Sequence, residues 1–343
     1  MNGNFAANTA IQNADVIINI GSRFDDRIIG NPNLFAPRAN EAYKTGNGGI
    51  VHVNIEASEF NQNVKAHVCV HSTSEEFLRS ILCDIMYKSR DEWFKQINEW
   101  QLRHPFSFTI PEDGLLRTQM VVSEINDQLQ QQQQQIQGPT ENNKKKQECV
   151  DKKQQQPYFI TTGVGNHQMM TAQFIKWTCP NTLLTSGSMG VMGVSLPYAI
   201  GAQIAHPGHT VISIDGDGSF NMTMGELKTV ADYSLPIKIA IMNDGEMSMV
   251  KAWEHVFLEQ RYSGSPIKQT LSYPQLAQAF GIKSMVCDSQ DELRNTMAEF
   301  LAYDDGPVLC DFRVKADFCL PLVKPGHALD DMFVLVSDFD LMI

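Results

Sequence analysis

Several features that would assign the chain to a particular class of protein are missing from its sequence. It has no run of 18 apolar residues, which argues against a membrane-spanning helix. No basic start followed by an apolar stretch opens the chain, so we expect no secretory signal, and an Arg- and Ser-rich transit segment is also missing. Basic residues are outnumbered, with 27 Lys and Arg against 39 Asp and Glu. The net charge of −12 therefore argues against nucleic acid as a partner.

The seven cysteines do not suggest a disulfide framework. Their number is odd, they are widely spaced, and no C-x-x-C pair occurs. This usage is typical of reduced thiols in an intracellular protein. The compartment itself is left open.

The pattern along the chain predicts an α/β organisation in two domains. Apolar residues make up 43% of 343, which is enough for two separate cores. Short apolar runs alternate with helical patterns, as in parallel sheets. The expected strands are 15–20, 50–55 and 67–70 in a first domain, and 158–162, 211–214, 237–242 and 307–314 in a second. Helices are expected at 74–88 and at 91–102, where Trp93 and Phe94 would serve packing.

A Gln-, Lys- and Asn-rich tract occupies residues 130–156. It has too few apolar side chains to offset the entropy lost on ordering. We predict a disordered insertion without a catalytic role.

The stretch 211–250 gives the strongest indication of chemistry. It predicts a strand, a crossover helix and a second strand, and Thr223 and Glu226 have the spacing of a capping box at the helix start. Asp217 and Asp244 then follow the carboxyl ends of the two strands, where ligands bind in open α/β sheets. Two nearby carboxylates favour a hard cation between them, and the glycines beside Asp217 allow a close anion. We predict a metal and diphosphate site, with an ordinary Asp-Gly turn as the alternative.

Other segments leave two interpretations open. Residues 21–27 follow a buried strand and combine Gly with Arg, which fits an anion site or a salt bridge at the strand end. Glu56 ends the next strand and could cap a loop. The Gly-x-Gly turn at 163–165 is only a weak dinucleotide signal. Met192 and Trp253, taken alone, would most simply be core residues.

Several of these segments together resemble one enzyme family. Gly216-Asp217-Gly218 followed by the Asn-Asp pair at 243–244 resembles the thiamin-diphosphate fold motif. The residues from 249 to 263, MVKAW through RYS, resemble the catalytic subunit of acetolactate (acetohydroxyacid) synthase. So do GSRFDDRIIGN at 21–31, GVG with a histidine at 163–167, and the glycine loop with LPYAIGA at 187–202. The likeness covers nearly the whole chain apart from the insertion.

The resemblance implies a fold and its division. We expect two doubly wound parallel-sheet domains of the α/β class. The first is a truncated FAD-type middle domain at 1–110. The second is a thiamin-diphosphate-binding C-terminal domain at 111–343, which contains the insertion at 130–156.

The resemblance also implies three cofactors and a set of contacts for each. Mg²⁺ would be held by Asp217, Asp244 and the carbonyl of Glu246. Thiamin diphosphate would contact Val164, Gly165, Asn166, His167, Gly190, Met192, Gly216, Asp217, Gly218, Ser219, Glu246, Met247 and Met249. FAD, structural in this family, would contact Arg23 and Glu56. The 2-ketoacid substrates would contact Met249, Val250, Trp253 and Arg27.

The sequence departs from the family pattern at four places. Asp244 stands where asparagine is usual, and Asn166 where glutamine is usual. Met247-Ser248 replaces Gln-Gly, and the segment 72–74 replaces Gly-Asp-Ala near the adenine end of the FAD pocket.

The implied reaction joins two pyruvates, or pyruvate and 2-ketobutyrate, with loss of CO₂ to give acetolactate or acetohydroxybutyrate. It belongs to isoleucine and valine biosynthesis. In the family the glutamate that activates the cofactor lies in an N-terminal domain, so we expect no proton-relay glutamate on this chain. We expect a transferase portion that forms a homo-oligomer or pairs with a chain carrying that domain, with a possible regulatory subunit. The alternatives are another thiamin-diphosphate 2-ketoacid decarboxylase and a catalytically silent paired module.

Overall fold

The computed structural model describes residues 3–137, 158–268, 270–319, 321–336 and 340–342. The chain divides into two compact units, one of residues 1–107 with 320–343 and one of residues 108–319. In the described ranges no helix is both long and apolar enough to cross a membrane. The domain limits expected from the sequence, 1–110 and 111–343, stay predictions.

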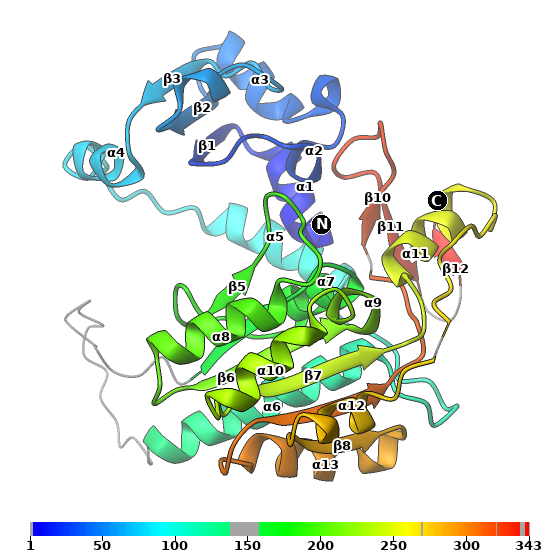
Figure 1. The fold of residues 1–343 in the computed structure, drawn as a ribbon. Coiled ribbons are helices and arrows are strands. Elements are labelled where there is room, and N and C mark those ends of the chain that lie inside the picture. Colours follow the sequence, from blue (N-terminus) through cyan, green and yellow to red (C-terminus); the bar gives the residue numbers. More distant parts are fainter. Residues whose placement is uncertain (1–2, 138–157, 269, 320, 337–339, 343) are drawn as a thin grey trace. The chain divides into compact units, whose positions relative to one another are not determined.

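The first unit contains a parallel sheet of three strands in the order β1-β2-β3 (Figure 1). Its elements are α1 (Phe5–Asn13), β1 (Val16–Ile20), α2 (Asp26–Ile29), η1 (Pro32–Leu34), α3 (Pro37–Lys44), β2 (Gly49–Asn54), η2 (Ala57–Glu59), β3 (Val68–His71), α4 (Ser74–Ile81), α5 (Asp91–Arg103), β10 (Leu322–Val323), β11 (Met332–Val336) and β12 (Asp340–Met342). The last three strands form a small antiparallel sheet that the sequence did not predict. Phe24, Phe35 and Ile50 share a core with Val323 and Leu329.

Two expectations for the first unit are wrong in part. The helix predicted over 74–88 ends at Ile81, although Thr73 and Glu76 form a capping box at its start. In α5 no side chain is buried, and that of Phe94 is 61% exposed, so Phe94 does not pack into a core of the described residues. Trp93 and Trp100 do contact each other edge to face, with their ring centres 5.7 Å apart.

The second unit is built on a six-stranded sheet, and every strand pair in it is parallel. The strand order is β5-β4-β6-β7-β9-β8. Its elements are α6 (Thr118–Gln137), β4 (Tyr158–Thr162), α7 (Asn166–Phe174), β5 (Leu183–Thr185), α8 (Ser195–Ala205), β6 (Thr210–Gly216), α9 (Asp217–Phe220), η3 (Met224–Glu226), α10 (Leu227–Asp232), β7 (Lys238–Asn243), α11 (Ser248–Phe257), α12 (Tyr273–Ala279), β8 (Lys283–Cys287), α13 (Gln290–Ala302) and β9 (Val308–Arg313).

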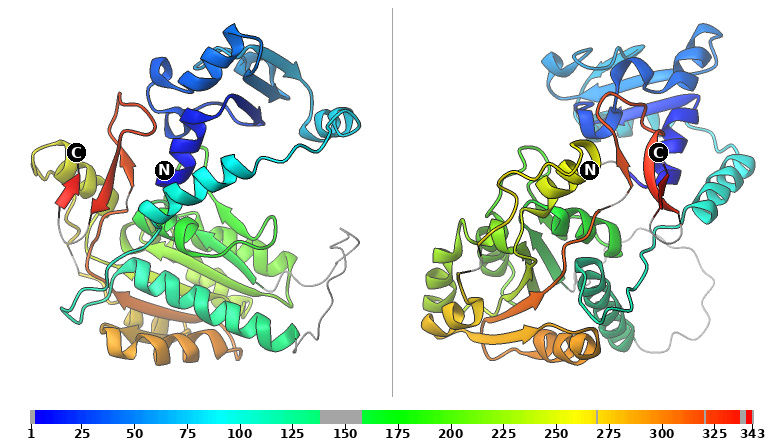
Figure 2. Two further views of the ribbon diagram at one scale, coloured as in Figure 1. Left: turned by 180° about the vertical axis from the view of Figure 1, so that it is seen from behind. Right: turned by 90° about the vertical axis from the view of Figure 1, so that its right-hand side faces the viewer.

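Helices cover both faces of this sheet (Figures 1 and 2). On one face α6 and α13 enclose a core that contains Ile125 and Met297. On the other, α8, α10 and α12 enclose a core that contains Leu196 and Val230. Because both faces are buried, the strands are nearly continuous apolar runs, as parallel sheets require. The predicted α/β class with parallel sheets is confirmed.

Two local predictions in the second unit need correction. The insertion predicted to be disordered from residue 130 is helical at its start, because α6 continues to Gln137. Glutamine is a good helix former, and the helix is already fixed by Ile125 and Leu129 in the core. Residues 138–156 of the predicted insertion lie outside the described residues. The capping box is also wrong, since the Thr223 hydroxyl donates to the carbonyl of Gly193 at 2.6 Å.

Candidate functional site

The sheet of the second unit changes its direction of winding between β4 and β6. From β4 the chain passes through α7 to the edge strand β5, and it returns through α8 to β6 on the other side of β4. The loops that follow β4 and β6 therefore begin side by side, at the place where such sheets bind ligands. β6 and β7 are also paired, with Gly216 opposite Met242. The turns after three strands thus meet at one edge.

Asp217 begins α9 directly after β6. Its Oδ1 accepts a hydrogen bond from the N–H of Gly218 at 2.9 Å, and its Oδ2 accepts one from the N–H of Gly245 at 3.1 Å. A Cβ added to Gly218 would lie 2.9 Å from Sδ of Met247, so the two turns pack closely at this glycine. The carboxylate of Asp217 therefore fastens the turn after β6 to the turn after β7.

Asp244 follows β7 and faces the same cavity as Asp217. Its Oδ1 accepts from the N–H of Glu246 at 3.0 Å, and its Oδ2 accepts from the hydroxyl of Ser248. Burial raises the pKa of Asp244 to about 6; the Ser248 hydrogen bond opposes this rise and the charge of Asp217 adds to it. A divalent cation beside the two carboxylates would offset both burial and repulsion. Their oxygens are ligands that suit Mg²⁺.

The backbone around Glu246 leaves one further oxygen available. The N–H of Met247 donates to Ser265 at 2.7 Å, and the carbonyl of Gly245 accepts from Ile267 at 2.8 Å. Between these bonds, the carbonyl of Glu246 receives no hydrogen bond from any residue that the structure describes. No cluster of three His, Cys, Asp or Glu side chains suited to a metal occurs among the described residues. A cation here would therefore need the carbonyl and ligand oxygens besides the two carboxylates.

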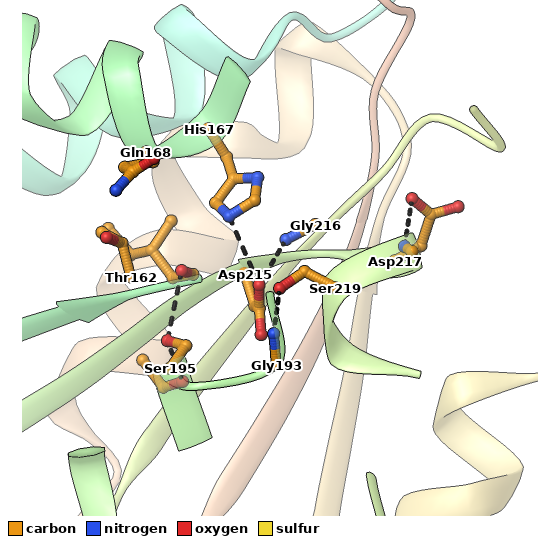
Figure 3. Close-up of polar contacts among 12 residues, drawn as sticks. Thr162, His167, Gln168, Gly193, Ser195, Asp215, Gly216, Asp217 and Ser219 are labelled. Atoms are coloured by element: carbon orange, nitrogen blue, oxygen red, sulfur yellow. Dashed lines mark hydrogen bonds and ion pairs between the residues drawn. The ribbon is translucent and has the colours of Figure 1, made fainter. Parts of the chain in front are cut away.

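The glycine loop after β5 carries Met192 into the cavity. Gly190 and Gly193 have φ values of +65° and +80°, which residues other than glycine adopt only with backbone strain. The N–H of Gly193 donates to Oγ of Ser219 at 2.8 Å (Figure 3). Together with the Thr223 bond, this contact holds the loop against α9.

His167 lies in the first turn of α7, which begins at the end of the loop after β4. Its Nε2 is 3.3 Å from Oδ1 of Asp215, a buried carboxylate near the end of β6 (Figure 3). The neighbouring Asn166 donates through its amide to the carbonyl of Asp317 at 3.0 Å. The first turn of α7 is therefore tied to β6 on one side and to the segment after β9 on the other.

Most of the predicted thiamin-diphosphate residues line one cavity. The predicted residues along its walls are Val164, Gly165, Asn166, His167, Met192, Gly216, Asp217, Gly218, Ser219, Asp244, Glu246, Met247, Met249 and Val250. Met249 also packs against Met169, Met170 and Cys319. The gathering of these residues supports their assignment, which stays a prediction.

Two predicted residues of the second unit do not line this cavity. Gly190 lies in the glycine loop beside it, and Trp253 packs against Phe257 within α11, with ring centres 4.9 Å apart. A second hollow, between β8 and α13, contains none of the predicted residues. The substrate role of Trp253 stays a prediction.

The predicted FAD residues lie in the first unit, after the carboxyl ends of the neighbouring strands β1 and β2. Arg23 pairs with Asp25 at 3.6 Å. Arg27, predicted to contact the 2-ketoacid substrate, also lies in the first unit and pairs with Asp26 at 3.7 Å, and its substrate role stays a prediction. Glu56 accepts from the N–H and hydroxyl of Ser58, which hold the pKa of Glu56 below its ordinary value. These contacts agree with the simpler interpretations left open by the sequence, a salt bridge at the strand end for residues 21–27 and a loop cap for Glu56. The FAD contacts of Arg23 and Glu56 stay predictions.

Sequence reasoning missed Asp215, Ser248, Thr118 and Met242 as residues of this region. Ser248, Thr118 and Met242 line the cavity, and Asp215 supports it from behind through His167. The acid at 215 stands at the end of an apolar strand, where a fully buried carboxylate is rare without a partner. The position of Asp215 at the end of this strand could therefore have indicated that the acid has a partner. The other three have no local pattern that would distinguish them.

Comparison with known proteins identifies the class. A family model described as "Thiamine pyrophosphate enzyme, C-terminal TPP binding domain" matches residues 163–312. Another, described as "Thiamine pyrophosphate enzyme, central domain", matches residues 1–81. Thiamine pyrophosphate is another name for thiamin diphosphate. Residues 1–81 and 163–312 are thus similar to the central and C-terminal domains of thiamine pyrophosphate enzymes.

Within this class the sequence is similar to acetolactate synthases. It is 37% identical to the "Acetolactate synthase catalytic subunit, mitochondrial" of Saccharomyces cerevisiae, over 96% of this chain and 45% of that protein. It is 39% identical to the "Acetolactate synthase, mitochondrial" of Schizosaccharomyces pombe, over 96% of this chain and 46% of that protein. It is 31% identical to the "Acetolactate synthase isozyme 2 large subunit" of Escherichia coli, over 98% of this chain and 55% of that protein. The chain spans about half the length of these relatives.

Proposed function

We propose that the second unit binds thiamin diphosphate together with Mg²⁺ in the cavity after β4, β6 and β7. The observation that carries the proposal is the placement of Asp217 and Asp244 after adjacent strands, with Gly245 fastening one turn to the other. The two carboxylates and the carbonyl of Glu246 would hold the cation. His167 and the backbone of the 163–165 turn would lie at the diphosphate.

The reaction that fits best is the formation of acetolactate from two pyruvates with release of CO₂. When bound, thiamin diphosphate supplies the carbanion chemistry that this reaction needs. The chain's own residues would orient the cofactor and keep water away. Met192 would support it from the glycine loop, and Met249 and Val250 would form an apolar wall beside it. The names of the relatives support this choice over a simple decarboxylase.

FAD and partner subunits form the less direct part of the proposal. Arg23 and Glu56 follow neighbouring parallel strands, so both lie at one edge of the first sheet, and Arg23 is exposed enough to turn toward an anion. FAD binding would be checked by the quenching of flavin fluorescence with wild-type protein and R23A. The word "subunit" in the names of two of these relatives supports a multi-chain enzyme, with a regulatory subunit as a partner of this chain.

The direct test is product analysis after incubation with pyruvate, thiamin diphosphate, Mg²⁺ and FAD. Because the chain matches only about half of each relative, it is assayed alone and mixed with the unmatched half of the Schizosaccharomyces pombe relative. We expect acetolactate in at least one of the two assays. D217A should abolish it, and D232N, at an exposed position of α10, should not.

The outcomes separate the alternatives. Acetaldehyde as the main product would contradict acetolactate formation and favour a decarboxylase. A silent module would be favoured if the proteins are folded and the chain binds thiamin diphosphate, but neither assay gives a product.

A further inference from the structure

The carboxylate of Asp215 is fully buried near the end of β6, and its surroundings are built to hold it there. Its Oδ1 accepts a hydrogen bond from the N–H of Gly216 at 3.1 Å and lies 3.3 Å from Nε2 of His167 (Figure 3). Its Oδ2, like Nε2 of His167, is buried and makes no hydrogen bond with the described residues. His167 is thus the one basic side chain that the described residues place within ion-pair distance of Asp215.

The residue at position 163 leaves the room for this carboxylate. A Cβ on Gly163 would lie 2.0 Å from Oδ1 of Asp215 and 2.2 Å from Oγ of Ser219. Both distances are far below van der Waals contact, so any side chain at 163 would displace the acid. The glycine after β4 therefore fits the acid at the end of β6, on the neighbouring strand.

The opposite edge of the His167 ring is confined by two more glycines. A Cβ on Gly165 would lie 3.0 Å from Nδ1 of His167, and a Cβ on Gly216 would lie 2.9 Å from the same atom. Both glycines and His167 line the candidate cavity. The ring is therefore held between Asp215 at Nε2 and a bare stretch of backbone at Nδ1.

We propose that Asp215 is a positioning residue for the diphosphate of the cofactor and acts through His167. Its Oδ1 lies within ion-pair distance of Nε2, fixes the ring plane, and so presents the Nδ1 edge to the part of the cavity between Gly165 and Gly216. An imidazole ring that carries a proton on both nitrogens can pair with a carboxylate through Nε2 and donate Nδ1–H to a phosphate oxygen. This inference rests on the proposed binding of thiamin diphosphate.

The position of Asp215 separates its role from that of Asp217. Asp217 binds the turn that follows β7, whereas Asp215 contacts the residues that follow β4. Loss of Asp215 should therefore weaken the diphosphate contact and leave the cation ligands in place. Loss of Asp217 should remove the cation itself.

The test compares wild type, D215N, H167A and the double variant by calorimetric titration with thiamin diphosphate at saturating Mg²⁺. D215N keeps the size of the side chain and removes its charge. We expect D215N and H167A each to lower the affinity by about tenfold or more. In the H167A background, D215N should cause no further loss, because both changes remove the same contact. Thermal unfolding confirms that each variant is folded, and D232N serves as the matched surface control.

A second measurement follows the ring without any assay of activity. In protein with ¹⁵N-labelled histidine, the His167 signals are assigned by their absence from H167A. We expect wild type to carry a proton on Nε2 and to change its Nδ1 signal when thiamin diphosphate and Mg²⁺ are added. D215N should lose this response.

The outcomes are distinguishable. If wild type binds thiamin diphosphate and D215N binds it equally well, the role of Asp215 is contradicted while the proposed function stands. Independent losses that add up in the double variant would also contradict it. If folded wild type binds no thiamin diphosphate at all, the proposed function fails and this inference fails with it.

Discussion

The N–H of Gly245 donates a hydrogen bond to Oδ2 of Asp217 at 3.1 Å. The two residues lie in the turns after β7 and β6, which are adjacent parallel strands. This bond brings the turn that carries Asp244 against the carboxylate of Asp217. Two acids at the ends of separate strands thereby become one candidate site for a cation.

The hydroxyl of Ser248 should tune the cation affinity of Asp244. It donates to Oδ2 of Asp244 and so lowers a pKa that burial has raised to about 6. S248A removes this bond, which should raise the pKa further and let protons compete more strongly with the cation. At pH 6 we expect Mg²⁺ affinity, measured calorimetrically with thiamin diphosphate present, to fall by about three- to tenfold. At pH 8 the loss should be small, and an equal loss at both pH values would contradict this explanation.

The raised pKa of Asp244 should also appear in the stability of the cation-free protein. Because the folded-state pKa is about 6 and the ordinary value is 3.8, the folded protein binds more protons than the unfolded chain between these pH values. The free energy of unfolding should therefore fall as pH rises from about 4 to 6, by up to about 3 kcal/mol for this group. Above about pH 7, where Asp244 is ionised in both the folded and the unfolded protein, this group adds no further slope.

Urea unfolding at pH 4, 5, 6 and 7 with EDTA measures this effect. D244N cannot ionise, so its profile should lack the part of the slope that Asp244 contributes. D232N should keep the wild-type profile. An identical slope in D244N and wild type would show that Asp244 is not the group responsible.

Replacement of two glycines of the second unit by alanine should change the stability of the protein in opposite directions. G163A places a Cβ against Asp215 and Ser219, and overpacking of this kind costs about 1–3 kcal/mol of stability. Gly201 lies within α8 and has open space where a Cβ would point, so G201A should stabilise the protein by about 0.4–1 kcal/mol. Chemical denaturation of the two variants measures both effects. A stable G163A would mean that the carboxylate of Asp215 can move aside.

The sequence predicted those parts of the fold that depend on local pattern. The strands around Asp217 and Asp244 are continuous apolar runs that end in turn residues, so their positions could be inferred without the rest of the chain. The resemblance to acetolactate synthase then supplied the residues of the glycine loop and the turn after β4. The structure gathers most of them at one cavity.

The features that the sequence did not predict depend on contacts between distant residues. The capping box failed because the Thr223 hydroxyl bonds to Gly193, thirty positions earlier. The partner of Asp215 could not be inferred, because His167 reaches it only through the pairing of β4 with β6. Phe94 sits at helical spacing with other aromatic residues, but spacing alone does not say whether a neighbouring surface covers it.

The central claim is that the second unit binds thiamin diphosphate through a cation held by Asp217 and Asp244. The most direct measurement is calorimetric titration of the chain with thiamin diphosphate, in Mg²⁺ and in EDTA, for wild type and D217A. We expect binding to wild type that requires Mg²⁺, and a loss of at least about a hundredfold in D217A, since one of two carboxylate ligands is gone. Binding that ignores both EDTA and the loss of Asp217 would contradict the claim.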